Sequence, residues 1–312
     1  MKKEKGRKSN NGTFFTVPVI VSGTILLIIL LSAVFAHVIA PYSPEATDYN
    51  ASLARAFSPG HILGTDRIGR DLFSRLLCGA QTSIFNAILI VAFEVVVGVP
   101  IGMLCGYYGG KLDDLVMRIW DIVCSIPSLL LAFIIVAAFG TGTYSGVLAI
   151  GIVYTPLTAK LSRSLMMTEK TAVYVEAARS LGYSDARIIF IHILPNIITT
   201  MIAQFTLDIG SAITAMATLS YLGLGVQAPG ADWGTLLKDG MDMLYLNPVL
   251  LIAPALAVMI TAISVNILSD GIQAYIDPEQ RKLPSFKKYR KKFLVPQKAG
   301  LAKNVSGVEG KA

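Results

Sequence analysis

The stretch Glu176-Ala177-Ala178-Arg179-Ser180-Leu181-Gly182 is polar, yet it lies between two stretches that are apolar enough to cross a membrane. Ten residues after its glycine comes a second marked stretch, His192-Ile193-Leu194-Pro195. A polar segment between two membrane spans must lie in water, where its surface is free to contact another molecule. These residues therefore predict a helix-turn-helix outside the bilayer.

The local pattern predicts two short helices in this segment. Thr171 is a candidate N-cap for the first helix. Within that helix three apolar residues recur every four positions, namely Val173, Ala177 and Leu181. We expect Gly182 to end it, because glycine adopts the left-handed conformation without steric cost. A second helix should follow and close at Pro195. Periodicity alone leaves open a plain amphipathic hairpin on the bilayer surface.

The composition of the chain requires lipid as a solvent. Hydrophobic residues make up 54% of the sequence and charged residues only 15%, and the mean hydropathy is +0.61. A helix that crosses the hydrocarbon core needs about 20 largely apolar residues. Six stretches fit this length approximately, and they cover residues 17–39, 83–105, 122–139, 146–166, 197–219 and 249–268.

The distribution of basic residues predicts the orientation. Of the 27 lysines and arginines, 22 lie in the two terminal arms, the second-to-third connection and the segment around Glu176, against five on the opposite side. The positive-inside rule then places both termini and this segment in the cytoplasm. The basic arms favour contact with anionic lipid. Nucleic-acid binding is not expected, because no basic face is interleaved with stacking aromatic residues.

These observations divide the chain into five parts. They are a basic cytoplasmic arm (1–16), a first span (17–39), an external segment (40–82), a five-span core (83–275) and a basic cytoplasmic tail (276–312). Within the external segment, residues 67–77 predict an amphipathic helix along the outer surface. A cleaved signal peptide is the alternative for the first span. Its apolar run is longer than the 7 to 15 residues usual for a signal core, which favours a retained span.

Several motifs together resemble one known family. The glutamate-alanine-alanine and glycine pattern at 176–182 is similar to the EAA loop of the membrane subunits of bacterial ABC importers, and His192-Ile193-Leu194-Pro195 resembles the form in the dipeptide, oligopeptide and nickel permease group. Leu63-Gly64-Thr65-Asp66 and Leu222-Gly223-Leu224-Gly225 fall in the order expected for that group's second, C-type permease subunit. The resemblance covers roughly residues 15 to 283.

This resemblance implies a fold and a function. The implied fold is all-α, with six transmembrane helices in the arrangement of a type I ABC importer permease, in the cytoplasmic membrane of a bacterium. The implied function is ATP-driven import of dipeptides or oligopeptides, together with a second homologous permease, two ATPase subunits and an extracellular or periplasmic solute-binding protein. Import of nickel or a metal-chelator complex is the alternative. The EAA loop spans about 168–196, and its implied ATPase-coupling residues are Glu176, Ala177, Ala178, Arg179, Gly182, His192, Leu194 and Pro195.

The chain itself has no motif for ATP hydrolysis. The stretch Gly109-Gly110-Lys111 fails as a phosphate-binding loop, because Cys105 stands where a glycine is needed and Leu112 where serine or threonine is needed. We therefore predict no catalytic, cofactor or metal site, and hydrolysis by separate subunits. An intramembrane enzyme or an ion-coupled transporter fits less well, because the spans carry no His-Glu-x-x-His or paired-aspartate arrangement, and no internal repeat is visible.

Two acids are predicted near the middle of spans. Glu94 and Asp208 would each cost about 2.5 to 3.5 kcal/mol facing lipid, so each should face the protein interior or a wet cavity. Gln204 lies one helical turn before Asp208 and shares its face. The alternatives are a lining of the translocation pathway or polar contacts that hold helices together. Gly98 and Gly102 form a small-xxx-small pair that predicts close helix packing.

The glycine-rich stretch after the fifth predicted span should be external. It is followed by acidic residues and a tryptophan that make a candidate docking surface for a solute-binding protein, with simple loop structure as the alternative. The residues are Asp232, Trp233 and Asp239.

Overall fold

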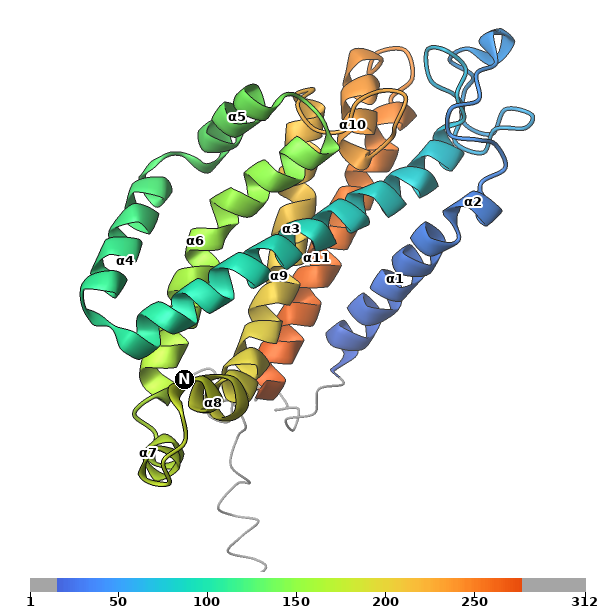
Figure 1. The fold of residues 1–312 in the computed structure, drawn as a ribbon. Helices are drawn as coiled ribbons and strands as arrows, with labels where there is room; N and C mark the ends of the chain where they lie inside the picture. The colour runs from blue at the N-terminus through green and yellow to red at the C-terminus, as the bar shows by residue number, and fades with distance from the viewer. Residues whose placement is uncertain (1–15, 277–312) are drawn as a thin grey trace, which may run out of the picture.

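The computed structural model describes residues 16–276, and this part of the chain is built of helices joined by loops (Figure 1). The predicted basic arm and basic tail lie almost wholly outside the described residues. The helices are α1 (Val17–Val34), α2 (Ala36–Ile39), η1 (Tyr49–Ala51), α3 (Leu72–Tyr108), α4 (Gly110–Ser125), α5 (Ser128–Phe139), α6 (Thr143–Glu169), α7 (Val173–Ser180), α8 (Asp185–Arg187), η2 (Ile188–Ile193), α9 (Leu194–Tyr221), α10 (Trp233–Asp242) and α11 (Val249–Ile276).

Five of these helices are long and apolar enough to cross a membrane: α1, α3, α6, the continuous stretch Asp185–Tyr221, and α11. The predicted third span, 122–139, is not one straight helix. It falls on α4 and α5, which are bent by 95° and make a sixth crossing only if counted as one broken span. Pro127 explains the break, because the residue before a proline is disfavoured in helical conformation and Ile126 is accordingly extended.

Helix α3 is longer than expected. Its 37 residues begin at Leu72, where the Asp71 side chain accepts a hydrogen bond from the Ser74 backbone N–H at 2.8 Å. The prediction of a separate surface helix over 67–77 is therefore wrong. Residues 67–71 are loop, and the remainder is the first turns of α3, because no proline interrupts the chain between Leu72 and the apolar span.

A row of glycines on α3 packs against α6. A Cβ at Gly98 would lie 3.0 Å from the Thr155 carbonyl oxygen, and one at Gly102 would overlap the Ala159 carbonyl. Gly106 continues the row one turn further. The two helix backbones thus approach so closely that side chains are excluded, and the predicted packing role of Gly98 and Gly102 is confirmed. We call this contact the α3–α6 seam.

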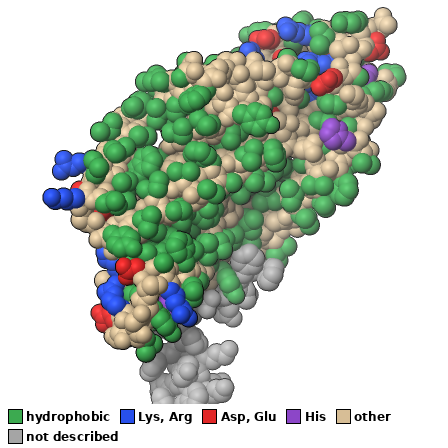
Figure 2. All heavy atoms as spheres, in the orientation of Figure 1, with side chains coloured by type: hydrophobic (Ala, Val, Ile, Leu, Met, Phe, Trp, Pro, Cys, Tyr) green, Lys and Arg blue, Asp and Glu red, His purple; other side chains and the backbone are tan. Residues whose placement is uncertain are grey.

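The two ends of the helix bundle differ. Helices α7 and α8 lie at one end, together with the start of α1 and the end of α11 (Figure 1). The loops of residues 40–71 and helix α10 lie at the other end. On the face shown in Figure 2, charged side chains gather at these ends and along one edge, and hydrophobic side chains cover much of the surface between. This is the pattern of a membrane protein whose two ends lie in water and whose middle lies in lipid. Which end is cytoplasmic stays a prediction.

Candidate functional site

The predicted coupling helix is present as α7, with a different start. Its N-cap is Ala172, whereas the Thr171 hydroxyl donates to the Thr168 carbonyl oxygen at 2.9 Å, so the predicted Thr171 cap is wrong. The predicted end is confirmed. Gly182 has φ of +79°, and the N–H of Tyr183 donates to the Ala178 carbonyl oxygen at 3.2 Å, closing the helix as a left-handed glycine cap does.

The second half of the segment is not a separate helix. The α8 turn runs through η2, a π-helical stretch, directly into α9, and Pro195 is the second residue of α9. The prediction that Pro195 closes the second helix is therefore wrong. A proline at the first turn of a helix is tolerated because its N–H would have no intrahelical partner there, and the wider turns of η2 absorb the change of register. The hairpin is thus fused to a membrane span.

The two faces of α7 have opposite environments. Val175 and Ala178 are buried against the isoleucines of η2, of which Ile188 and Ile193 are fully buried. The apolar row found in the sequence lies on the other face. Val173 is 81% exposed, Leu181 is 72% exposed, and Ala177 between them is also exposed. An apolar row on a helix that is already packed on its other side is available to a partner. We call it the exposed α7 face.

The remaining predicted coupling residues lie around this face. Glu176 and Arg179 are exposed. His192 stacks on Tyr183 with ring centroids 5.4 Å apart, and the guanidinium of Arg187 lies 4.4 Å from the centre of the Tyr183 ring. Leu194 packs against the same apolar cluster as Val175, whereas Pro195 is exposed. The structure thus brings these residues together in one small unit, residues 173–195, which we call the α7 unit.

This unit is tied to the end of α3. The Tyr107 hydroxyl donates to Asp185 Oδ1 at 2.6 Å and accepts a weaker hydrogen bond from Arg179 Nη2 at 3.4 Å. Lys170 Nζ, just before the unit, donates to the Gly106 carbonyl oxygen at 2.7 Å. The segment around α7 is therefore joined to α3 by polar contacts as well as by packing. Sequence reasoning missed Tyr107, because nothing local marks a tyrosine that pairs with Asp185.

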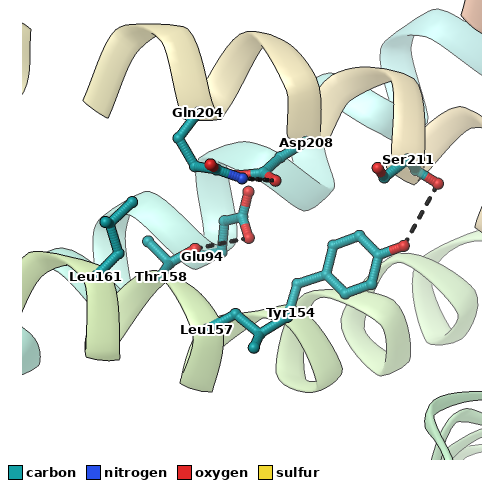
Figure 3. Close-up of a pocket in the computed structure, with 8 residues that line it drawn as sticks. All are labelled: Glu94, Tyr154, Leu157, Thr158, Leu161, Gln204, Asp208 and Ser211. Carbon is teal, nitrogen blue, oxygen red and sulfur yellow. Dashed lines mark hydrogen bonds between the residues drawn. The ribbon is translucent and has the colours of Figure 1, made fainter. Parts of the chain in front are cut away.

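The second site is a cavity of about 420 Å³ between α3, α6 and α9 (Figure 3). It brings together the three polar residues that the sequence singled out in the spans. Glu94 comes from α3 and is 1% exposed, and its Oε2 accepts a hydrogen bond from the Thr158 hydroxyl at 3.0 Å. Gln204 Nε2 donates to Asp208 Oδ1 at 2.9 Å on α9. We call this space the acidic cavity.

The lining of the acidic cavity also includes residues that sequence reasoning did not single out. Tyr154, Thr158 and Ser211 are neutral polar residues, and such residues are too common in spans to signal a site. The Tyr154 hydroxyl donates to the Ser211 carbonyl oxygen at 3.4 Å. Beyond this contact lies a second cavity of about 360 Å³, which shares Tyr154 and Ser211 and adds Thr214, Thr218 and Asn266. Polar groups thus follow one side of α9 over several turns.

At the other end of the bundle, two predicted docking residues are buried. Asp232 is 0% exposed and caps α10, accepting a hydrogen bond from the Thr235 backbone N–H at 2.8 Å. Burial raises the pKa of this carboxyl. Trp233 is 2% exposed, and its indole N–H donates to the Leu76 carbonyl oxygen at 3.2 Å. Neither side chain reaches a surface that a docking protein would contact, which corrects the prediction for both residues.

Asp239 is partly exposed and belongs to a cluster of ion pairs. Its Oδ2 lies 3.3 Å from Arg70 Nη2 and 3.4 Å from Arg75 Nη2. Both arginines also pair with Asp66, Arg70 Nε at 2.6 Å and Arg75 Nη1 at 3.5 Å. The cluster joins residues 66–75 to α10. Asp239 therefore forms ion pairs within the chain, and its role in docking a binding protein stays a prediction.

The bundle, the broken α4–α5 pair and the α7 unit define a class, the multi-pass transport subunits of ABC importers. The chain belongs to the family described as "Binding-protein-dependent transport system inner membrane component", which matches residues 98–282. Residues 18–57 match "N-terminal TM domain of oligopeptide transport permease C". The family consists of inner-membrane transport subunits, so the predicted family, fold class and membrane location are confirmed.

Relatives and solved structures agree with this assignment. The chain is 39% identical over 260 residues to the "Probable D,D-dipeptide transport system permease protein DdpC" of Escherichia coli (strain K12), covering 83% of this chain and 87% of that one. It is 36% identical over 261 residues to the "Glutathione transport system permease protein GsiD" of Pectobacterium atrosepticum, covering 83% and 86%. An inward-facing structure of the MetNI methionine ABC transporter matches with a TM-score of 0.55 at 18% identity, over 66% of this chain and 96% of that one, and this likeness shows the fold.

Proposed function

We propose that this permease subunit carries dipeptides or oligopeptides across the inner membrane. The support is that relatives at 36% to 39% identity are named as D,D-dipeptide and glutathione permeases. Glutathione and dipeptides share a small size and amide bonds. Nickel, alone or in a chelator complex, is the alternative substrate.

The exposed α7 face is the observation that carries the coupling role. We propose that this face binds in a groove of a separate ATPase subunit, and that a second, homologous permease binds another ATPase in the same way. The face is apolar and unpartnered, whereas the opposite face of α7 packs on η2. Tyr107 at the end of α3 holds the same segment through Arg179 and Asp185. A short helix held in this way moves as a rigid lever, so that closure of two ATPases changes the positions of the spans.

The acidic cavity is the proposed part of the translocation pathway. It lies midway along α3, α6 and α9, and it is open space lined by polar groups rather than a tight helix contact. In alternating access, ATP-driven closure opens the paired permeases outward to receive substrate from a solute-binding protein, and hydrolysis resets them. A buried acid beside a cavity is explained by this role, because a polar path requires polar walls.

Uptake measurements test the proposed function. In a strain that lacks this chain, uptake of a labelled dipeptide, a labelled tetrapeptide and nickel is compared before and after the chain is restored at a normal membrane level. Restored peptide uptake with unchanged nickel uptake is expected. If only nickel uptake is restored, nickel and not a peptide is the substrate. If uptake of none of the three is restored, a role in their import is contradicted.

A further inference from the structure

We infer that the acidic cavity binds the protonated amino group of the substrate during its passage through the membrane. This inference rests on the proposed function and makes it more specific, because it assigns one end of a peptide to one place in the pathway. Three features of the cavity carry it. They are its charge, the hydrogen-bonding groups it leaves unpaired, and the chemical character of its walls.

The charge of the cavity is unbalanced. Two acids line it, Glu94 from α3 and Asp208 from α9, and none of the described residues that line it is lysine, arginine or histidine. The remaining lining residues are Tyr154, Leu157, Thr158, Leu161, Gln204 and Ser211. Carboxyl groups in a poorly solvated place are costly when charged unless a cation lies close by. A cation that enters this space is therefore attracted by both acids and meets no competing positive side chain.

The acids are also held ready to accept hydrogen bonds. Glu94 is almost completely buried, yet its Oε1 atom has no hydrogen-bond partner, while Oε2 is held by Thr158. Gln204 donates to Asp208 Oδ1 from one side, and the Asp208 and Glu94 carboxyl groups are close enough to interact with each other. In Figure 3 the Glu94 carboxyl group projects toward Asp208. An ammonium group has three N–H donors and no acceptor, so it complements the unpaired Glu94 oxygen and the facing Asp208 carboxyl group.

The walls distinguish an amine from a metal ion. Leu157 and Leu161 form an apolar side of the cavity, which suits the carbon atoms next to an amino group. A divalent metal ion requires a shell of several ligands, and the described residues contain no group of three or more histidine, cysteine, aspartate or glutamate side chains that could hold one. A volume of about 420 Å³ is within the range of small-ligand sites and exceeds what a helix-packing contact would leave empty.

Chemical labelling of the assembled importer tests this inference. The complete complex carries Ser211→Cys as a reporter on the cavity wall, and the three native cysteines are replaced by serine. The reporter is treated with a cationic aminoethyl thiosulfonate or a neutral methyl thiosulfonate. After correction for their rates with a free thiol, the cationic reagent should react about tenfold faster, the order of one charge-assisted hydrogen bond. Adding Glu94→Gln and Asp208→Asn should remove this preference.

Protection of the reporter cysteine by substrate provides a second test. Glycylglycine should slow the cationic reaction, whereas N-acetyl-glycylglycine at the same concentration should not. The matched control is Tyr154→Phe, which changes the same cavity without changing its charge and should keep the preference. Equal reaction of both reagents with the parent complex would overturn the inference, as would protection by nickel but not by glycylglycine. Loss of the second permease from the purified complex that carries Glu94→Gln and Asp208→Asn would overturn it too. The two acids would then act by holding the interface between the two permeases.

Uptake separates the inference from the proposed function. In the complex without the reporter, Glu94→Gln and Asp208→Asn should each lower dipeptide uptake at least about fivefold, since each removes a charge-assisted contact of this order. Unchanged uptake in both variants would contradict the pathway role itself, whatever the labelling shows. Reduced uptake with no preference for the cationic reagent would keep the pathway role and reject the amino-group site.

Discussion

The α7 unit and the acidic cavity are both polar places in an apolar chain, but they are built in different ways. The α7 unit is made from neighbouring residues, and its turn at Gly182 and its packing on η2 are local. The acidic cavity is made from Glu94, Thr158 and Asp208, which three separate helices bring together. The first site is thus a property of a short segment, whereas the second is a property of how the long helices pack.

This difference has a physical consequence for how each site responds to change. The apolar residues of the α7 unit pack on one another and on residues of α3, α6 and α9. The exposed α7 face takes no part in this core, so a change on that face should leave the unit folded and disturb only partner binding. The acidic cavity has no local core. Its geometry depends on the α3–α6 seam, which sets the distance between Glu94 and Thr158. The following predictions test this contrast, from the largest expected effect to the smallest.

Breaking the seam should have the largest effect. Gly102→Leu places a side chain where even a Cβ overlaps the Ala159 carbonyl, so α3 and α6 must separate along the turns that hold Glu94. We expect loss of most folded protein, because overpacking costs typically ~1–3 kcal/mol and separation of two helices adds lost contacts. The measurement is the amount of monodisperse subunit in detergent after extraction from membranes.

The control for this change is Gly23→Leu. Gly23 lies in α1, and a Cβ there meets no atom within 4 Å, so the same substitution should be tolerated. Equal yields for the two variants would show that the seam does not hold the cavity together, and the contrast between the two sites would lose its basis.

A change on the exposed α7 face should have a more limited effect. Val173→Asp puts a charge on a side chain that is 81% exposed, so the subunit itself has no reason to unfold. If this face binds an ATPase, burying the new carboxylate in the interface costs several kcal/mol and co-purification of the ATPase should fall by more than about tenfold. Val173→Leu keeps the face apolar and should retain the ATPase. Normal co-purification of the Asp variant would place the ATPase contact elsewhere.

The same contrast explains how much of the structure the sequence predicts. Spans were found because long apolar runs need no tertiary information, and the Gly182 turn was found because glycine is required where φ is positive. The orientation of α7 was not found, because the row of Val173, Ala177 and Leu181 shows a face without saying what covers it. Pro195 was misread as an end, because a proline is equally suited to the first turn of the next helix.

The acidic cavity was only partly predictable for a related reason. Glu94 and Asp208 stand out because acids are rare in spans, but nothing in the sequence says that they face each other. The burial of Trp233 and Asp232 was missed, because a glycine-rich stretch gives no indication of whether the next residues cap a helix inside the fold. The Gly182 turn is thus predictable from local backbone geometry, whereas the burial of Asp232 and Trp233 depends on tertiary packing that the sequence does not show.

The smallest predicted effect lies where the two sites are connected. Tyr107 is at the end of α3, the helix that carries Glu94, and its hydroxyl donates to Asp185 in the α7 unit. Tyr107→Phe keeps the ring, which is 9% exposed, and removes this bond together with the weaker one from Arg179. A hydrogen bond to a charged group contributes about 1.5–3 kcal/mol at most, so the subunit should fold and bind its ATPase normally. If the bond helps to transmit movement from α7 to α3, the amount of substrate imported per ATP hydrolysed should fall by about two- to fivefold.

The neighbouring Tyr108→Phe is the control, because that side chain is 58% exposed and should leave the ratio unchanged. An unaltered ratio in the Tyr107 variant would mean that packing alone connects the α7 unit to the cavity.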